Sequence, residues 1–124
     1  MRYLLDSNAC IEALRHPVGS VAQRVNSLEP RDAALPIPVV AELLIGAYRQ
    51  RNTPTQRQAV EHFIKMFECV PFITADAQKA GVLGARLLDM GKAIGAVDLQ
   101  IAAMAVRRSL VLVTHNVREF TRIE

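Results

Sequence analysis

The hexapeptide YLLDSN, residues 3–8, gives the clearest indication of the fold class of this chain. Its first three residues form a short buried strand, and Asp6 and Ser7 are residue types that cap the start of a helix. A buried strand that leads directly into a helix is typical of an α/β fold with a parallel sheet. Ligands of such folds bind beyond the carboxyl ends of the strands, so Asp6 lies where a site is expected.

The rest of the chain repeats this alternation. Short apolar runs predict three more strands, at residues 33–37, 69–72 and 110–113. Helices are predicted between them, at 18–28, at 39–50, from Thr53-Pro54, from Thr74 to Gly91, and from Gly95 to 107. No two strands are separated by a hairpin-length turn. We therefore expect one domain over residues 1–124, a three-layer α/β sandwich with a short parallel sheet of about four strands flanked by helices.

Composition excludes several classes of protein. The chain has 124 residues, of which 51% are apolar and 22% charged, as in a globular domain. No apolar run approaches the roughly 18 residues of a membrane helix, and the N-terminus shows no secretion leader. Cys10 and Cys69 are the only cysteines. These features predict a reduced cytoplasmic protein without a membrane anchor.

The cations indicate an anionic partner. Arginine accounts for all but three of the 15 cationic residues, the lysines being Lys65, Lys79 and Lys92. Arginine binds phosphate through two donors at once, which favours a nucleic-acid partner, although a GC-rich genome also raises the arginine content. Tryptophan is absent and aromatic residues make up 5% of the chain, which argues against a base-stacking platform.

The carboxylates separate into two groups. Most have a cation within helical reach, or lie in a loop or at the end of the chain, and are explained as solvated: Glu12, Glu29, Asp32, Glu61, Glu68, Asp76, Asp89, Glu119 and Glu124. Asp6, Glu42 and Asp98 remain, and each has apolar surroundings in the sequence. A carboxylate in such surroundings needs a cation or a proton.

Three converging carboxylates without a resident cation predict a bound metal. Oxygen ligands select a hard ion, Mg²⁺ or Mn²⁺, which is typical of phosphodiester cleavage. Two of the acids also have a structural alternative. The dipole of its helix would stabilise Asp98, and Glu42 would either extend to solvent or pair with an arginine such as Arg49 through tertiary structure.

In these residues the sequence resembles the PIN domains, in particular the VapC-type toxins of toxin–antitoxin pairs. The resemblance extends over nearly the whole chain. It rests on residues 4–8, on Val40-Ala41-Glu42-Leu43 with Gly46, on Ile94-Gly95 leading to Asp98, on Ile101-Ala102-Ala103, and on Val113-Thr114-His115-Asn116 followed by Glu119-Phe120.

This resemblance implies a metal-dependent endoribonuclease that an antitoxin neutralises and that forms a homodimer. Asp6 and Asp98 are then the direct Mg²⁺ or Mn²⁺ ligands, and Glu42 reaches the metal directly or through water. Thr114 orients the cluster, and Ser7 assists it.

One position departs from the family pattern. Asn116 occupies the place of a fourth acid, which favours one tightly held metal. Glu119 is a substitute for that acid or a solvated partner of Arg122, and His115 is a general base or an orienting residue.

Two further expectations concern partners. Helices 18–28 and 39–50 present apolar stripes beside which an antitoxin segment is expected to lie. Four arginines either grip RNA phosphates or form a solvated face: Arg107, Arg108, Arg118 and Arg122.

Two other readings compete with the nuclease. A phosphoacceptor receiver domain is disfavoured because no lysine follows the last predicted strand. A non-catalytic PIN-like module that binds RNA is the serious alternative, and metal-dependent RNA cleavage discriminates between the two.

Overall fold

The computed structural model describes residues 2–49 and 51–114. Its elements follow the order β1 (Tyr3–Leu5), α1 (Ser7–Arg15), α2 (Ser20–Ser27), η1 (Pro30–Asp32), β2 (Ala33–Pro36), α3 (Ile37–Ala47), α4 (Pro54–Lys65), β3 (Glu68–Val70), α5 (Thr74–Asp89), α6 (Ala96–Arg108) and β4 (Val111–Val113). The sequence also predicts a closing turn over residues 117–120, and this prediction lies outside the described residues.

The four strands form one parallel sheet in the order β3-β2-β1-β4. Leu5 pairs with Val113 across β1 and β4, and Leu4 pairs with Ala34 across β1 and β2. The predicted α/β sandwich with a parallel sheet of four strands is thus confirmed.

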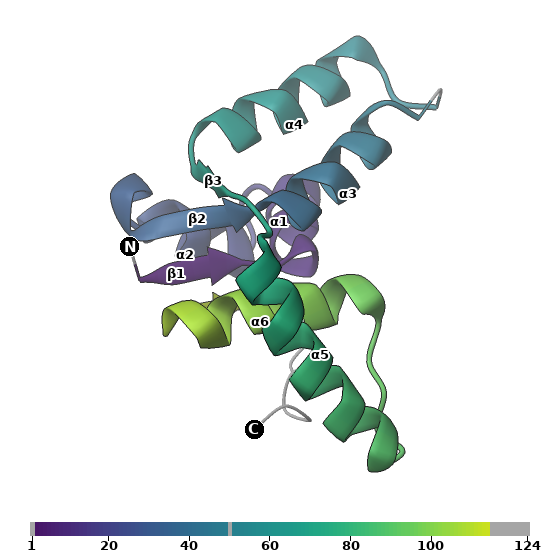
Figure 1. Ribbon diagram of the computed structural model, residues 1–124. Helices are drawn as coiled ribbons and strands as arrows, with labels where there is room; N and C mark the ends of the chain where they lie inside the picture. Colours follow the sequence, from purple (N-terminus) through teal and green to yellow (C-terminus); the bar gives the residue numbers. More distant parts are fainter. Residues whose placement is uncertain (1, 50, 115–124) are drawn as a thin grey trace.

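Successive side chains of β1 lie on opposite faces of the sheet, because side chains along a strand point alternately to its two faces. Leu5 packs in a core with Cys10 of α1 and Val25 of α2, whereas Leu4 packs with Met104 of α6. α6 accordingly lies on one side of the sheet and the α1–α2 pair on the other (Figure 1). The sheet is covered on both faces, which is why its strands are continuous apolar runs.

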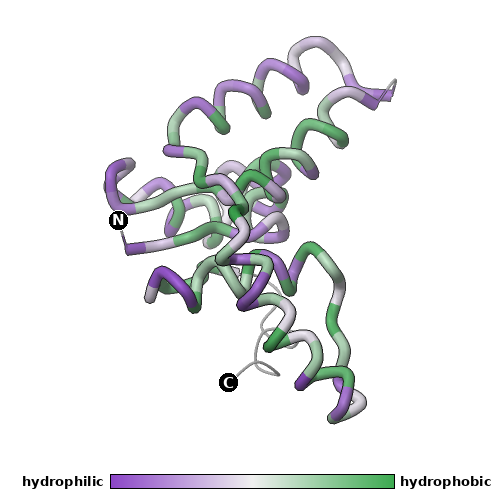
Figure 2. Tube along the Cα trace, viewed as in Figure 1, coloured by the Kyte–Doolittle hydropathy of each residue, from purple (hydrophilic) through white to green (hydrophobic). Residues whose placement is uncertain are grey.

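α3 and α4 project together from one end of the sheet (Figure 1). α3 is hydrophobic along most of its length (Figure 2). Its inner residues Val39 and Leu43 belong to the core, but Ile45 and Tyr48 beyond them are 68% and 58% exposed. The apolar sequence of α3 therefore supplies both a core contact and an exposed apolar surface.

Several helix boundaries confirm the sequence signals. Thr53 caps α4, and Gln56 completes a capping box. Gly91 follows α5 with φ +69°, a left-handed conformation that glycine adopts without strain. Two details differ. Val18, expected on the apolar face of its helix, is 87% exposed because α2 begins only at Ser20. The N-cap of α5 is Ile73, so Thr74 is the first helical residue.

No helix among the described residues combines the length and apolar character needed to cross a membrane.

Candidate active site

Asp6 is the centre of the site that the sequence predicts. It directly follows β1 and is fully buried. One carboxylate oxygen, Oδ1, accepts the Ala9 N–H at 2.8 Å and so caps α1. The other, Oδ2, accepts a hydrogen bond from the hydroxyl of Thr114. The cap is the predicted one, and the second oxygen connects α1 to the end of β4.

Thr114 reaches Asp6 because of the strand register. Leu5 and Val113 are paired neighbours in parallel strands, so the residues that follow them emerge side by side at the carboxyl edge of the sheet. The Asp6 N–H also donates to the Val113 carbonyl at 3.1 Å. The predicted proximity of these two strand ends is therefore present in the structure.

Ser7 brings Glu42 to the same place. Ser7 is buried in the first turn of α1, and its hydroxyl donates a hydrogen bond to Oε1 of Glu42 in α3. Glu42 itself is exposed, although its apolar sequence neighbours suggested a buried side chain. The cause is the orientation of α3, which buries Val39 and Leu43 and turns Glu42 away from the core.

Asp98 lies in the first turn of α6 and is half-buried. α6 contacts α3, the helix that carries Glu42. The N-terminal half of α6 also packs against α5, where Gly84 leaves room for Leu99: a Cβ on Gly84 would lie 2.8 Å from Leu99 Cδ2. Asp98 thus has a fixed helical setting, and the dipole of α6 favours its negative charge.

The oxygen atoms at this site are of the kind that a hard cation binds, but the side chains do not form a complete metal-binding cluster. Carboxylates from three elements and two hydroxyls offer oxygen atoms, the ligands that Mg²⁺ and Mn²⁺ prefer. Among residues 2–49 and 51–114, no three His, Cys, Asp or Glu side chains are gathered closely enough to form a metal site. Mg²⁺ commonly binds through one or two carboxylates with water and phosphate, which is compatible with this arrangement. Asn116, His115 and Glu119 lie outside the described residues.

Cys10 lies beneath this site. Burial raises the pKa of the Cys10 thiol, and the negative charge of Asp6 raises it further. The thiol is consequently neutral and unreactive in the folded protein, as expected for a cysteine that serves as a small core residue.

The structure corrects the interpretation of Asp76, which the sequence pairs with Lys79 in solvent. Asp76 is fully buried, and its Oδ1 accepts hydrogen bonds from Arg107 Nε and Arg108 Nη1, each at 2.6 Å. Its Oδ2 accepts from Arg108 Nη2 at 3.0 Å and from the Ile73 N–H at 2.9 Å. Asp76 therefore ties the start of α5 to the end of α6.

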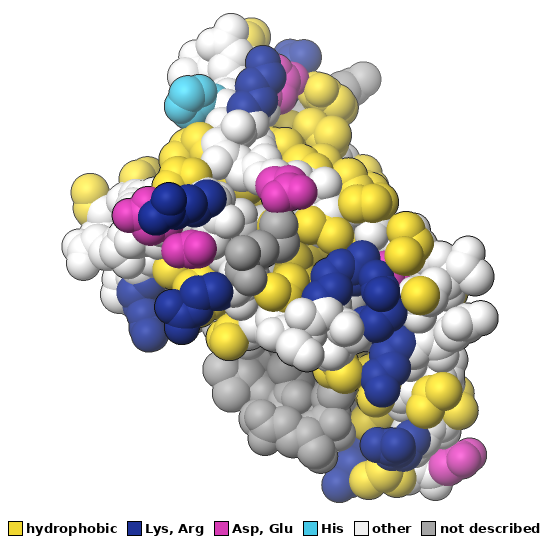
Figure 3. Space-filling view, turned by 60° about the vertical axis from the view of Figure 1, so that its left-hand side comes forward, with side chains coloured by type: hydrophobic (Ala, Val, Ile, Leu, Met, Phe, Trp, Pro, Cys, Tyr) yellow, Lys and Arg dark blue, Asp and Glu magenta, His cyan; other side chains and the backbone are white. Residues whose placement is uncertain are grey.

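This network also changes the role of two predicted phosphate-binding arginines. Burial by itself would raise the pKa of Asp76, but the hydrogen bonds from Arg108 and Arg107 outweigh it and hold this pKa well below its ordinary value. Lys and Arg side chains do gather in a band over α5 and α6 (Figure 3). Within that region Arg107 and Arg108 are bound to Asp76. The other two arginines of that prediction, Arg118 and Arg122, lie outside the described residues.

Comparison with known proteins gives the family. The PIN domain family matches residues 3–124. The chain is 32% identical over 123 residues to the tRNA(fMet)-specific endonuclease VapC of Salmonella typhimurium, covering 99% of this chain and 92% of that protein. It is 32% identical over 124 residues to Ribonuclease VapC1 of Haemophilus influenzae (strain R2866), with the same coverage.

Solved structures agree with this assignment. DNA-bound VapBC from Salmonella typhimurium matches with a TM-score of 0.91 at 32% identity, covering 99% of this chain and 92% of that chain. VapBC2 from Rickettsia felis bound to a promoter DNA fragment matches with a TM-score of 0.88 at 28% identity, covering 98% and 92%. On the combined evidence of fold, site and similarity, the chain belongs to the PIN domain family and is a VapC-type member of it.

Proposed function

We propose that this protein is an endoribonuclease that acts as the toxin of a toxin–antitoxin pair in the cytoplasm. The observation that carries the proposal is the buried Asp6 at the end of β1, held by the hydroxyl of Thr114, with Glu42 brought alongside by Ser7. The relatives of this chain are named ribonucleases or endonucleases. Their activity and this arrangement of carboxylates support the same reaction, hydrolysis of an RNA phosphodiester bond.

We further propose that the reaction depends on Mg²⁺ or Mn²⁺. A bound divalent ion polarises the phosphate and lowers the pKa of an attacking water. In this scheme Asp6 and Asp98 would hold the ion, and Glu42 would hold it directly or through a water. Thr114 keeps Asp6 in one orientation by its hydrogen bond, and Ser7 does the same for Glu42. Asn116 is proposed to add the neutral oxygen of its side-chain amide to the ligands of the ion.

The proposed protein partner is an antitoxin encoded beside this chain. The solved relatives are VapBC complexes, which supports such a partner. A groove of about 470 Å³ between α1, α3 and α4 offers an apolar floor that includes Leu14, Leu43 and Val60, with Glu42 on its wall. A hollow of about 490 Å³ lies beside α2, lined by Val21 and Leu28 among others. A hollow thus lies beside each of the two helices, α2 and α3, next to which an antitoxin segment is expected to bind, and this supports the proposal.

A second copy of the chain is the other proposed partner. A homodimer would cover the exposed apolar side chains of α3, of Tyr48 directly after it, and of α5; those of the two helices are Ile37, Ile45, Val82 and Leu88. Light scattering on the purified protein tests this, and a monomer at micromolar concentration would contradict it.

The enzymatic proposal is tested by incubating the purified protein with bulk tRNA. We expect cleavage in Mg²⁺ or Mn²⁺ that stops when EDTA is added. Co-expression with the product of the neighbouring gene should yield a complex that does not cleave. RNA binding without any cleavage would instead support the non-catalytic PIN-like module.

A further inference from the structure

The groove between α1, α3 and α4 carries two arginines in addition to its apolar floor. Arg15, in the last turn of α1, and Arg51, which follows α3, both line it together with Glu42. Glu42 is hydrogen-bonded to Ser7, the residue next to Asp6. The groove therefore borders the candidate active site at Glu42, and the two arginines line the same groove.

Neither arginine is engaged by another side chain in the part of the chain that the structure describes. Both are exposed, and within residues 2–49 and 51–114 neither has an ion pair or a hydrogen bond through its side chain. Arg107 and Arg108 differ in this respect, because the buried carboxylate of Asp76 already satisfies them. Of these four arginines, the two in the groove have their donors available for a ligand.

The electrostatics of the site call for cations at this position. The proposed site is built from three carboxylates, Asp6, Glu42 and Asp98, and a substrate that is itself a polyanion must bind beside them. Phosphates next to the scissile one are repelled unless positive side chains face them. A guanidinium meets this need well, since its planar fork donates two parallel hydrogen bonds to a phosphate.

We infer that Arg15 and Arg51 are substrate-binding residues, which hold RNA phosphates flanking the one that is cleaved. The inference rests on the proposed ribonuclease function. It assigns phosphate binding to the groove rather than to the end of α6.

Kinetics and binding of single variants test the assignment. Arg15→Gln and Arg51→Gln should each raise KM for an initiator tRNA transcript about 3- to 10-fold and change kcat less than about twofold, because flanking phosphates position the strand without entering the reaction. The salt dependence of binding to the same transcript should weaken by a slope of about 0.7 for each arginine removed. Arg51→Lys should keep the salt slope of the wild type, because lysine keeps the positive charge. Its KM should lie between that of the wild type and that of Arg51→Gln, because lysine lacks the planar fork of arginine.

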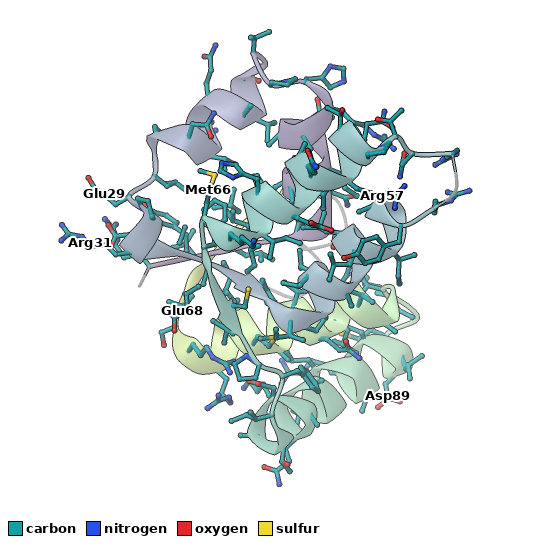
Figure 4. All side chains as sticks on the ribbon, turned by 90° about the horizontal axis from the view of Figure 1, so that it is seen from above. Glu29, Arg31, Arg57, Met66, Glu68 and Asp89 are labelled. Carbon is teal, nitrogen blue, oxygen red and sulfur yellow. The ribbon has the colours of Figure 1, made fainter. Side chains whose placement is uncertain are left out.

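Arg31→Gln is the matched control. Arg31 is an exposed arginine on η1, on the opposite side of the molecule from Arg57 of α4, whose helix borders the groove (Figure 4). The substitution removes the same charge, so KM and the salt slope should remain those of the wild type. An equal loss in Arg31→Gln would mean that net charge alone matters, and it would overturn the inference.

The inference and the proposed function fail separately. If the wild type cleaves RNA and the Arg15 and Arg51 variants keep its KM and salt slope, the inference is wrong while the ribonuclease stands. If those variants lose affinity only for the antitoxin, the arginines serve the protein partner and the inference is again wrong. If the wild type does not cleave, the inference is tested by the salt dependence of tRNA binding. A variant that combines Arg15→Gln with Arg51→Gln and has the same salt slope as the wild type would overturn the inference.

Discussion

The hydroxyl of Thr114 donates a hydrogen bond to Oδ2 of Asp6 across 108 residues of sequence. The contact follows from the parallel register of β1 and β4, which places the residue after each strand at the same edge of the sheet. Asp6 is fully buried, so each polar contact to its carboxylate affects the charged state of that group strongly. The pair connects the fold to the proposed chemistry.

Replacing Thr114 by valine removes this hydrogen bond while keeping the shape of the side chain. We expect RNA cleavage to fall by about 10- to 100-fold, the usual effect of losing a residue that orients a metal ligand. Mn²⁺ affinity, measured by calorimetry, should weaken in parallel. Thr114→Ser is the control and should keep most of the activity, since it retains the hydroxyl. Equal activity in the valine and serine variants would show that the hydrogen bond has no role.

A second prediction concerns the stability provided by Asp76. In Asp76→Asn the two guanidinium groups of Arg107 and Arg108 lose their charged acceptor, so unfolding at pH 7 should become easier by about 3 kcal/mol. Urea denaturation measures this difference. Lys79→Gln is the control, because the sequence offers Lys79 as the partner of Asp76 and the structure does not. It should change the free energy of unfolding by less than about 0.5 kcal/mol.

The interaction of Asp76 with Arg107 and Arg108 also predicts how stability depends on pH. The pKa of Asp76 is depressed in the folded protein, so its contribution is fully present above the unfolded value of about 4 and is lost as the pH falls toward the folded pKa. Wild type and Asp76→Asn should therefore begin to approach each other in stability only as the pH falls below about 4. A difference that grows as the pH falls would contradict the depressed pKa.

The fold could be predicted closely from the sequence because its signals are local. Each strand is a short apolar run, and helix caps such as Asp6 and Thr53 act on residues two or three positions away. Helix boundaries in the structure differ by one to three residues from the predicted ones where several neighbouring residues could begin the helix. α2 is an example, since the sequence predicts its start at residue 18 and it begins at Ser20. Long-range geometry was predictable only where strand register determines it, as for Thr114 and Asp6.

The errors share a cause, since sequence neighbours say little about which way a helix faces. Glu42 is flanked by apolar residues and yet is exposed, because α3 has an apolar outer face as well as an inner one. Asp76 has Lys79 within helical reach, but its actual partners are 31 and 32 residues away. Arg107 and Arg108 are adjacent in the last turn of α6, and nothing in the sequence connects them with Asp76.

Asn116→Asp tests the departure from the family pattern at the proposed fourth acid. The added carboxylate should raise the apparent affinity for Mn²⁺ in calorimetry, since one more anionic ligand faces the ion. It should also lower the melting temperature in EDTA, since another like charge joins the cluster. If Asn116 only caps the closing turn, aspartate replaces it without either change. Identical binding and melting in both proteins would remove Asn116 from the site.

The central claim, a carboxylate site that cleaves RNA with a divalent metal, is tested most directly by Asp6→Asn. Asparagine keeps the volume and the cap of α1 but removes the charge, so melting in EDTA should be unchanged or improved. Without this carboxylate the transition state of cleavage should lose several kcal/mol of stabilisation by the metal. Cleavage of tRNA in Mg²⁺ or Mn²⁺ should therefore be slower by more than about 100-fold. Asp98→Asn should behave in the same way. Folded Asp6→Asn protein that cleaves at the wild-type rate would contradict the account.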